Sequence, residues 1–356
     1  MDLSARAGER NDITDVTGVT VGHHQRIGEG WLTGSTVVIP PRETIGAADV
    51  RGGGPATRET DAMAPTTMVE QVDAVCLTGG SAYGLDAAGG VMSWLEEVER
   101  GFPVGPAPHQ VVPIVPTAAI FDLGAGGSFP NRPDASFGHS AAVAAGGSRG
   151  SGPVEQGSVG AGTGARAGRL KGGVGSASAV TASGATVGAL AVVNSAGSAF
   201  DPRTGDLWGV RMGIGGEFDH LRRPARSEVR ALAADTADGS SAFNTTLVVV
   251  ATDARLSKPE CHRLCGAAHD GMARAINPVH GYTDGDVAFG LATGAVEITP
   301  EPRPGVLSSV PRIVALGQVL EVAADTVSRS IAHAVSRASS AGDLPSYRDA
   351  FPSAFR

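Results

Sequence analysis

The sequence predicts an α/β fold in which layers of sheet and helix pack on one another. Two observations carry this prediction. Short runs rich in β-branched residues recur between turn residues, as strands do, and several are apolar on both faces. Fewer segments carry the wider apolar spacing of helices. Strands that are apolar on both faces must be covered on both, so the two kinds of segment are expected in separate layers.

The strands are expected at residues 16–23, 35–39, 73–77, 111–115, 186–193, 245–252 and 286–292. Each run is short, bounded by turn residues and rich in Val and Ile, which is typical of strands.

Three helices and one shorter helix are expected. Residues 85–99 carry many small side chains, which allow a helix to lie close to a sheet. A second helix begins near Ser257, because Ser257 and Glu260 form a capping-box pattern. Residues 313–335 keep one apolar face over a long helix. A short helix is also expected around 227–234.

Two segments read as loops, and no internal repeat is evident. Residues 146–175 are rich in Gly and Ser, and residues 221–241 are rich in charge and end in Asp-Gly-Ser-Ser. The second segment is the most linker-like part of the chain.

Composition excludes several classes of protein. Lys and Arg total 28 against 36 Asp and Glu, a net charge of −8 without a basic cluster, which argues against a nucleic-acid partner. No apolar run is long enough for a membrane span, and no apolar segment near Met1 indicates secretion. Three Cys fit a reducing compartment, so a cytoplasmic globular protein is expected. Gly supplies 51 of 356 residues, roughly twice the usual share.

Neither a cofactor nor a metal is expected. Residues 162–167 match G-x-G-x-x-A, but no acidic residue follows between Arg169 and Asp201, where a dinucleotide site needs one. Cys261, Cys265 and His269 share one face of the second helix. Zinc usually takes ligands from more than one element, so these three read as buried helix residues.

Two polar segments remain open to either a structural or a functional interpretation. Gly80, Ser81 and Tyr83 lie between a strand and a helix, where amides bind a ligand or simply form a tight turn. Asp284 and Asp286 precede an apolar strand, where two carboxylates orient a cation or donor, or form a solvated turn.

Asn244 and Thr245 stand between the linker-like loop and the apolar strand at 245–252. Taken alone, this is an ordinary strand start. It is also where an N-terminal nucleophile must lie, because cleavage after Asn244 gives Thr245 a free α-amine beside its hydroxyl. An α-amine has a pKa of about 8, so it serves as a general base at neutral pH.

Taken together, these segments resemble the DmpA-type hydrolases, which include L-aminopeptidase/D-esterases, β-peptidyl aminopeptidases and nylon-oligomer hydrolases. Matching segments occur in family order at residues 13–23, 49–53, 79–85, 160–175, 192–194, 243–246 and 284–286. The Asn-Thr-Thr run and the acid pair look like the Thr-nucleophile nylon-oligomer hydrolases more than the Ser-nucleophile peptidases.

This resemblance implies a four-layer α/β/β/α sandwich of the type shared with ornithine acetyltransferases. It further implies that residues 1–356 form a single self-processing domain. Self-cleavage would give an α chain of residues 1–244 and a β chain of residues 245–356, which stay together. A homo-oligomer of four or more subunits is also implied.

The resemblance assigns roles to five catalytic residues. Thr245 serves as nucleophile in self-cleavage and in substrate cleavage, Asn194 stabilises the oxyanion, and Lys171 lies near the nucleophile. Arg169, two residues earlier, is the alternative to Lys171. Asp284 and Asp286 orient the nucleophile and its amine.

The expected substrate-binding residues are Gly80, Ser81, Tyr83 and Phe121. Phe121 stands where the family has a Tyr, and a Phe ring donates no hydrogen bond. Another group, such as a backbone amide, must complete the oxyanion site, or turnover is slower.

The resulting hypothesis is a self-cleaving N-terminal-threonine amide hydrolase that acts through an acyl-enzyme. Its expected substrates are linear amide oligomers, followed by small peptides, amides and esters. The alternatives are an aminopeptidase of the DmpA type and an acyltransferase, which passes the acyl group to an amine rather than to water.

Overall fold

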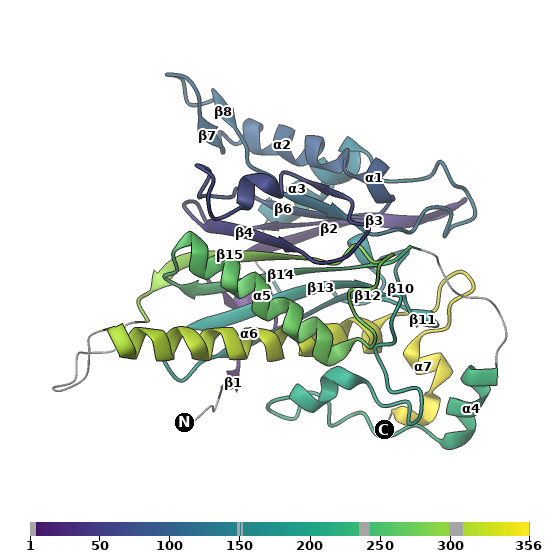
Figure 1. The fold of residues 1–356 in the computed structure, drawn as a ribbon. Coiled ribbons are helices and arrows are strands. Elements are labelled where there is room, and N and C mark those ends of the chain that lie inside the picture. Colours follow the sequence, from purple (N-terminus) through teal and green to yellow (C-terminus); the bar gives the residue numbers. More distant parts are fainter. Residues whose placement is uncertain (1–4, 148–149, 151, 235–242, 299–308, 356) are drawn as a thin grey trace.

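Two sheets lie face to face between two layers of helices (Figure 1). The computed structural model describes residues 5–147, 150, 152–234, 243–298 and 309–355. The larger sheet has the order β1 (Arg6–Ala7), β12 (Gly173–Val180), β13 (Thr186–Asn194), β14 (Thr245–Ala254), β15 (Val287–Val296) and β4 (Ile45–Val50). The smaller sheet has the order β2 (Thr20–Gly28), β3 (Trp31–Ile39), β6 (Val75–Thr78), β9 (Thr117–Ala119) and β5 (Thr57–Arg58). Neighbours are antiparallel except in the pairs β14–β15 and β6–β9, which are parallel.

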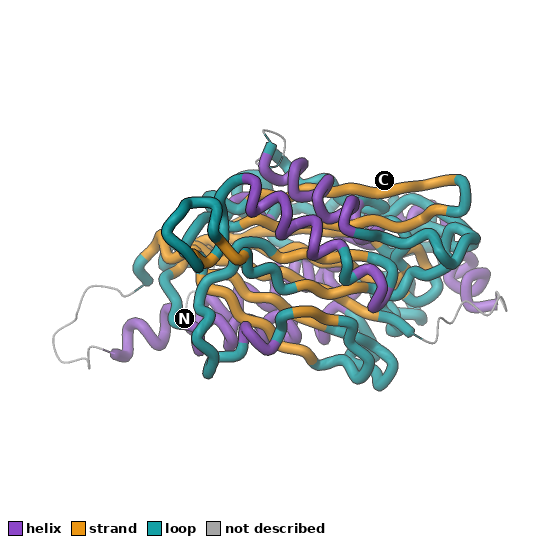
Figure 2. Tube along the Cα trace, turned by 90° about the horizontal axis from the view of Figure 1, so that it is seen from above, coloured by secondary structure: helices purple, strands orange, loops and turns teal. Residues whose placement is uncertain are grey.

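Each sheet carries a pair of helices on its outer face. Helices α2 (Ala87–Glu97) and α3 (Ala135–Gly146) cover the smaller sheet, and they lie side by side when seen from above (Figure 2). Helices α5 (Lys258–Ala275) and α6 (Ser309–Arg337) cover the larger sheet. The chain therefore forms the α/β/β/α sandwich that the family resemblance implied.

Shorter elements connect these layers. They are β7 (Phe102–Pro103), β8 (Val111–Val112), β10 (Arg166–Ala167), β11 (Leu170–Lys171), α1 (Ser81–Gly84), α4 (Arg226–Ala234) and α7 (Tyr347–Ala350). Short 3₁₀ turns occur at Ile13–Asp15, Asp61–Met63, Gly160–Gly162, Trp208–Met212 and Pro352–Ala354. None of the described helices is long and apolar enough to span a membrane.

Three apolar clusters fill the spaces between the layers. The central cluster joins side chains such as Val249 of β14 and Leu77 of β6. Because β14 also contributes Val248 and Val250 to the cluster under α5 and α6, it is buried on both faces. A one-residue slip would exchange these two sets of side chains, but both faces are apolar, so polar residues at its ends help to fix its register.

Close helix-on-sheet packing requires glycine at particular strand positions. A Cβ at Gly175 of β12 would lie 2.0 Å from the Ser330 carbonyl oxygen of α6. A Cβ at Gly22 of β2 would lie 2.2 Å from the Ala141 carbonyl oxygen of α3. Only glycine fits at such distances, so small residues let the helices approach the strands.

Several predicted boundaries are wrong for identifiable reasons. The strand predicted at 16–23 begins only at Thr20, because Gly18 has a φ of 84° and forms a turn. The strand predicted at 111–115 is reduced to β8. The segment 146–175 is no plain loop, since it contains β10 and β11 and the start of β12. The short helix near 227–234 is confirmed as α4, and residues 235–241 of that loop lie outside the described residues.

Candidate active site

Thr245 is the first residue of β14, at the end of the larger sheet. Its Cα partner across the antiparallel ladder is Asn194, the last residue of β13. Both residues are buried, with exposed fractions of 4% and 2%. The apolar continuation of β14 thus anchors Thr245 where two strand ends and several loops meet.

The carbonyl oxygen of Asn244 accepts two hydrogen bonds. The Thr245 hydroxyl Oγ1 donates to it over 2.5 Å, and the backbone N–H of Gly285 donates to it over 2.9 Å. A Cβ on Gly285 would lie 2.7 Å from Thr245 Oγ1. The hydroxyl and an amide donor therefore meet at one carbonyl, the one that precedes Thr245.

Asp286 is tied to both the strand and the loop before it. Its Oδ1 accepts the N–H of Thr246 at 2.6 Å, and its Oδ2 accepts the backbone N–H of His280 at 3.1 Å. The ring Nδ1 of His280 lies 2.8 Å from the same Oδ2. His280 was not found from the sequence, because a single loop histidine six residues before an aspartate forms no recognisable pattern.

Asp284 connects two loops. Its Oδ2 accepts the Gly281 N–H at 2.9 Å, and its Oδ1 accepts the Ala196 N–H at 3.4 Å. Burial raises the pKa of Asp284, and the nearby Asp286 carboxylate raises it further. The acid pair is therefore buried and hydrogen-bonded, unlike the solvated turn that was its alternative.

Asn194 has both ends of its amide engaged. Its Nδ2 donates to the carbonyl oxygen of Phe121 at 3.3 Å, and its Oδ1 accepts the backbone N–H of Arg166 at 2.9 Å. The first bond is long for an N–H···O contact, so the amide can exchange it for a stronger acceptor.

Lys171 is completely buried but is not bonded to Thr245 in the part of the chain that the structure describes. Its Nζ donates to the carbonyl oxygens of Gly162 and Gly172, each at 2.9 Å. Burial lowers the pKa of Lys171 to about 7, and the negative charge of Asp122 opposes this. Arg169, the alternative, donates to the Leu232 carbonyl oxygen at 2.6 Å and has an exposed guanidinium.

Asp122 is a second buried group that the sequence did not single out. It accepts the Thr33 hydroxyl at 2.7 Å and the Gly80 N–H at 2.6 Å. Burial raises the pKa of Asp122 to about 6, although these hydrogen bonds and Lys171 lower it. Asp122 and Lys171 therefore form a buried electrostatic pair behind the site.

The expected substrate-binding residues separate into two groups. Ser81 and Phe121 line a cavity at Thr245. Gly80 gives its amide to Asp122, and the Ser81 amide donates to the Ile120 carbonyl oxygen, so neither amide faces a ligand. Tyr83 lies outside this cavity, with its exposed ring 3.7 Å from the guanidinium carbon of Arg132. In this structure, both amides therefore donate to acceptors within the chain.

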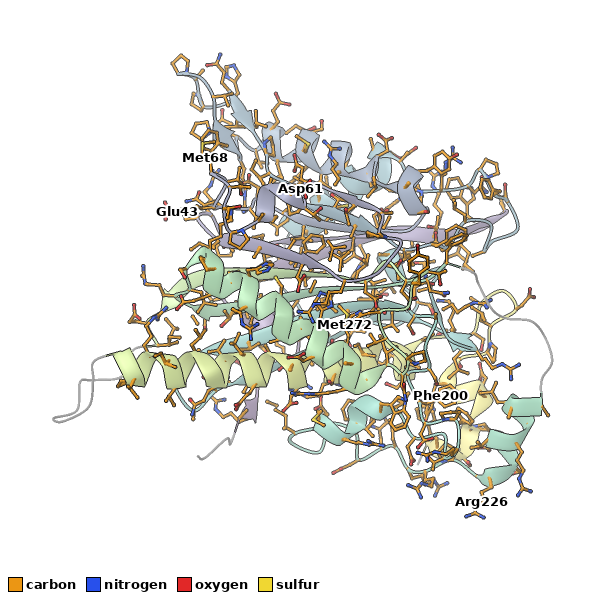
Figure 3. The ribbon with its side chains drawn as sticks, viewed as in Figure 1. Glu43, Asp61, Met68, Phe200, Arg226 and Met272 are labelled. Carbon is orange, nitrogen blue, oxygen red and sulfur yellow. The ribbon has the colours of Figure 1, made fainter. Side chains whose placement is uncertain are left out.

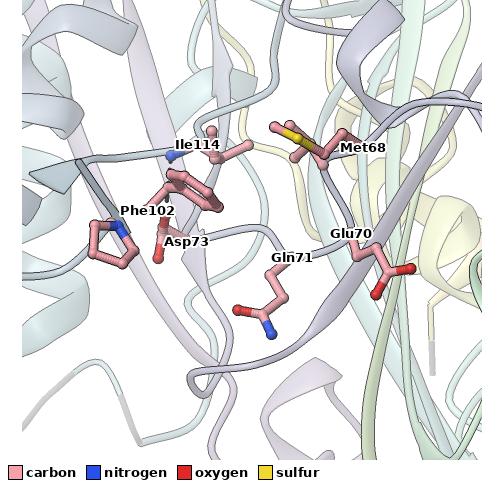
Figure 4. Close-up of a pocket in the computed structure, with 9 residues that line it drawn as sticks. Met68, Glu70, Gln71, Asp73, Phe102 and Ile114 are labelled. Atoms are coloured by element: carbon pink, nitrogen blue, oxygen red, sulfur yellow. Dashed lines mark hydrogen bonds between the residues drawn. The ribbon is translucent and has the colours of Figure 1, made fainter.

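Two cavities adjoin at Phe121. The nucleophile cavity has a volume of about 210 Å³ and is lined by Gly54, Ser81, Phe121, Phe243, Asn244 and Thr245, among others. The arginine cavity has a volume of about 230 Å³, and its lining includes Leu32, Phe121, Asp122, Arg166, Asn194 and Asp343. The rings of Phe121 and Phe243 are 5.4 Å apart. A third cavity, beside β7 and lined by Met68, Phe102 and Ile114 (Figure 4), contains no residue of either.

The cysteine and histidine face of α5 is a packing surface. Cys261, Cys265 and His269 are all buried, and His269 Nε2 lies 3.0 Å from the Asp49 carbonyl oxygen of β4. No group of three potential metal ligands occurs among the residues that the structure describes.

Comparisons with solved structures support the fold. A β-aminopeptidase of Burkholderia sp. superposes with a TM-score of 0.68 at 22% identity, covering 99% of this chain and 96% of that one. The L-aminopeptidase D-Ala-esterase/amidase of Ochrobactrum anthropi, described as a variant of the Ntn hydrolase fold, also gives 0.68 at 22% identity, over 94% and 88%.

Sequence comparisons show the family. An uncharacterized aminopeptidase of Mycobacterium tuberculosis (strain ATCC 25618 / H37Rv) is 50% identical over 97% of this chain and 99% of its own length. The 6-aminohexanoate-oligomer endohydrolase of Kocuria sp. (strain KY2) is 32% identical over 83% of this chain and 79% of its own length. The model of peptidase family S58 matches residues 11–344. The chain therefore belongs to peptidase family S58 and is a hydrolase.

Proposed function

We propose that this hydrolase cleaves itself between Asn244 and Thr245 and then uses Thr245 to hydrolyse linear amides. One observation carries the proposal. The Thr245 hydroxyl lies 2.5 Å from the Asn244 carbonyl oxygen, which also accepts the Gly285 amide. A carbonyl held by a fixed donor beside a hydroxyl is suited to attack by that hydroxyl.

Self-cleavage then proceeds in two balanced steps. Thr245 Oγ1 bonds to the carbonyl carbon of Asn244, and the Gly285 N–H stabilises the oxyanion. The C–N bond then breaks, the proton lost by the hydroxyl ends on the Thr245 nitrogen, and an ester joins the two residues. Water hydrolyses this ester, which leaves a carboxylate on Asn244 and a free amine and hydroxyl on Thr245.

Substrate cleavage repeats this chemistry with an external amide. The free α-amine of Thr245 removes the hydroxyl proton, and the oxygen attacks the substrate carbonyl. Asn194 and the Gly285 amide stabilise the oxyanion, which compensates for the missing hydroxyl at Phe121. Asp284 and Asp286 hold the loop and strand that carry these groups. The protonated leaving amine departs, and water releases the acyl group.

The two chains are proposed to remain together as one domain. Strand β14 of the 245–356 chain pairs with β13 of the 1–244 chain and with β15. The cut leaves this ladder intact, so the sheet continues to join the chains. The protein is further proposed to be cytoplasmic and to form a homo-oligomer. Light scattering of the purified protein tests the oligomeric state.

Linear amide oligomers or short peptides are the proposed substrates. Support comes from the relatives, one of which is named a 6-aminohexanoate-oligomer endohydrolase and another an aminopeptidase. Release of an amino-terminal residue, as an aminopeptidase performs, is the second candidate. Peptides and their N-acetylated forms separate the two, because an aminopeptidase needs the free amine.

Intact-mass spectrometry of the purified protein tests self-cleavage and its position together. The expected products are chains of 244 and 112 residues. Dividing 35.7 kDa in proportion to length gives masses of about 24 and 11 kDa. The Thr245→Ala variant should give one full-length mass. A single full-length mass for the unaltered protein, or a cut elsewhere, would refute the proposal.

A further inference from the structure

We propose that Arg166 binds the free carboxylate of the substrate's leaving amine, so that the favoured substrates release a single amino acid or ω-amino acid. This inference rests on the proposed function. It assigns a ligand chemistry to the arginine cavity, which adjoins the nucleophile but has no part in the self-cleavage step.

The position of Arg166 is fixed by the site itself. Its backbone N–H donates to Asn194 Oδ1 at 2.9 Å, and Asn194 is the ladder partner of Thr245. Arg166 and Asn194 both line the arginine cavity. Asn194 therefore lies between the two residues: its side chain accepts the Arg166 backbone N–H, and its own backbone pairs with the strand that begins at Thr245.

The guanidinium of Arg166 has one buried nitrogen, Nη1, that lacks a hydrogen-bond acceptor in the described structure. Asp343 on the cavity rim is its electrostatic neighbour, yet the two form no ion pair within the described structure. Burial lowers the pKa of Arg166, and Asp343 opposes this effect. A buried donor without an acceptor is destabilising.

A carboxylate is the ligand that such a donor fits best. The guanidinium is permanently charged, donates only, and offers its N–H groups in a planar fork that matches two carboxylate oxygens. An ammonium would be repelled, and a neutral amide would satisfy the nitrogen without neutralising its charge. Two acidic residues also line the cavity, the exposed Asp343 and the buried Asp122, whose charge Lys171 offsets. They disfavour a second negative charge on the ligand, so a ligand with one carboxylate fits best.

The orientation follows from the uncut chain. Phe243 and Asn244 line the nucleophile cavity and form the acyl half of the peptide that is cut. The acyl half of a substrate therefore belongs in the same place. The arginine cavity lies beyond Phe121, beside Asn194, and is left for the amine half. Its volume of about 230 Å³ suits one small residue.

The direct test measures binding of one amino acid, 6-aminohexanoate, and of its carboxamide to the purified protein by calorimetry. The wild type should bind the acid at least tenfold more tightly than the carboxamide. Arg166→Gln should lose this preference, Arg166→Lys should keep part of it, and Asp343→Asn should strengthen it. Arg226→Gln is the matched control, because Arg226 is exposed on α4 at the outer edge of the molecule (Figure 3).

A kinetic test uses a linear amide dimer and its C-terminal carboxamide. Arg166→Gln should raise KM for the free acid by roughly 10- to 100-fold, and it should raise KM for the carboxamide by a clearly smaller factor, because the neutral amide loses only a hydrogen bond. Equal binding of acid and carboxamide by the wild type, or an equal loss for both in Arg166→Gln, would overturn the inference. Failure of the proposed function can be told apart from failure of this inference, because intact-mass spectrometry shows independently whether the chain cleaves itself at Thr245.

Discussion

His280 holds Asp286 through two hydrogen bonds to one carboxylate oxygen. The backbone N–H lies 3.1 Å and the ring Nδ1 2.8 Å from Asp286 Oδ2. Because a carboxylate only accepts, Nδ1 carries the proton, and Nε2 of a neutral ring keeps a lone pair. Nε2 is buried without a partner in the described structure, and the ring meets that of His269 edge-on at 4.8 Å. The imidazole thus acts as a fixed donor behind Asp286.

Removing this donor should slow self-cleavage. His280 has a φ of 55°, a conformation that both Gly and Asn tolerate. His280→Asn keeps a side-chain N–H near Asp286, whereas His280→Gly does not. A hydrogen bond to a charged group contributes about 1.5–3 kcal/mol, so the Gly variant should cut itself at least about tenfold more slowly than the Asn variant. Time-resolved intact mass measures both rates, and equal rates would show that His280 has no positioning role.

Gly285→Ala should block self-cleavage without unfolding the chain. The added Cβ would lie 2.7 Å from Thr245 Oγ1, so the hydroxyl must rotate away from the Asn244 carbonyl. Gly285 does not have a positive φ, so its backbone conformation suits Ala. The added Cβ would also lie 3.0 Å from the Gly54 carbonyl oxygen, so that loop must shift by a few tenths of an ångström. We expect cleavage to fall by about 10²-fold or more, comparable to the loss of an oxyanion donor. The fraction cut is read by mass, with circular dichroism to verify folding.

The matched control for Gly285 is Gly89→Ala in α2. A Cβ at Gly89 has nothing within 4 Å, and Ala is a better helix former than Gly by about 1 kcal/mol. This variant should cut itself at the wild-type rate and melt slightly higher. Wild-type cleavage in Gly285→Ala would contradict the proposed geometry.

The layers of the fold were predictable because the central strands and long helices carry strong apolar patterns. Strand β14 combines a polar start with Leu247 and Val248–Val250, and the capping box at Ser257 marks the start of α5. Strand β12 was missed because its Gly, Ser and Ala residues resemble a loop. Those residues are small because α6 packs directly on them, as the Gly175 distance shows, and that contact is not visible in one sequence.

The site was predictable only where side chains carry the chemistry. Resemblance brought Thr245, Asn194 and the acid pair together, and the structure places them around one strand end. Gly285 contributes only a backbone amide, and His280 is a single loop residue, so neither leaves a pattern. Tyr83 was included by its motif, but the helical turn points its ring toward Arg132.

Arg329→Met should strongly destabilise the fold. Arg329 is 1% exposed, and its Nε lies 2.5 Å from Glu217 Oε1. Removing the cation leaves a buried carboxylate with weaker partners, so a loss of about 3–5 kcal/mol is expected. Urea unfolding in a Thr245→Ala background, which keeps one chain, measures it. Arg274→Met is the control, because its ion pair with Asp325 is half exposed and contributes at most about 1 kcal/mol.

The same cluster should make stability fall in acid. Burial opposes the charge on Glu217, but hydrogen bonds from His333 and Arg329 outweigh it and hold the Glu217 pKa well below its usual range. Its contribution is therefore present above about pH 4.5 and is lost as the pH falls. Arg329→Met should flatten this acid-side slope, and an unchanged slope would contradict the assignment.

Lys171 should make stability rise with pH as well, but in a window at neutral to alkaline pH. Its pKa falls from 10.5 in the unfolded chain to about 7 in the fold, mainly through burial. Between these values the unfolded chain binds a proton that the folded chain has released, so stability rises with pH. The pKa of Asp122 is raised to about 6, so its protonated form stabilises the fold at low pH. This contribution is lost as the pH rises from 3.8 to about 6, below the window in which Lys171 acts.

Lys171→Met isolates this contribution. Urea unfolding of Thr245→Ala with and without Lys171→Met, from pH 7 to 9, should show stability rising with pH only when the lysine is present. The window stops at 9 because buried Cys76 and Cys261, whose pKa values are raised to about 12, retain their protons and oppose the rise above it. Parallel curves would mean that Lys171 keeps its ordinary pKa and remains charged beside Asp122. If the two stability curves diverge, the Lys171 amine is neutral in the folded chain at the pH where the Thr245 α-amine must act as a base.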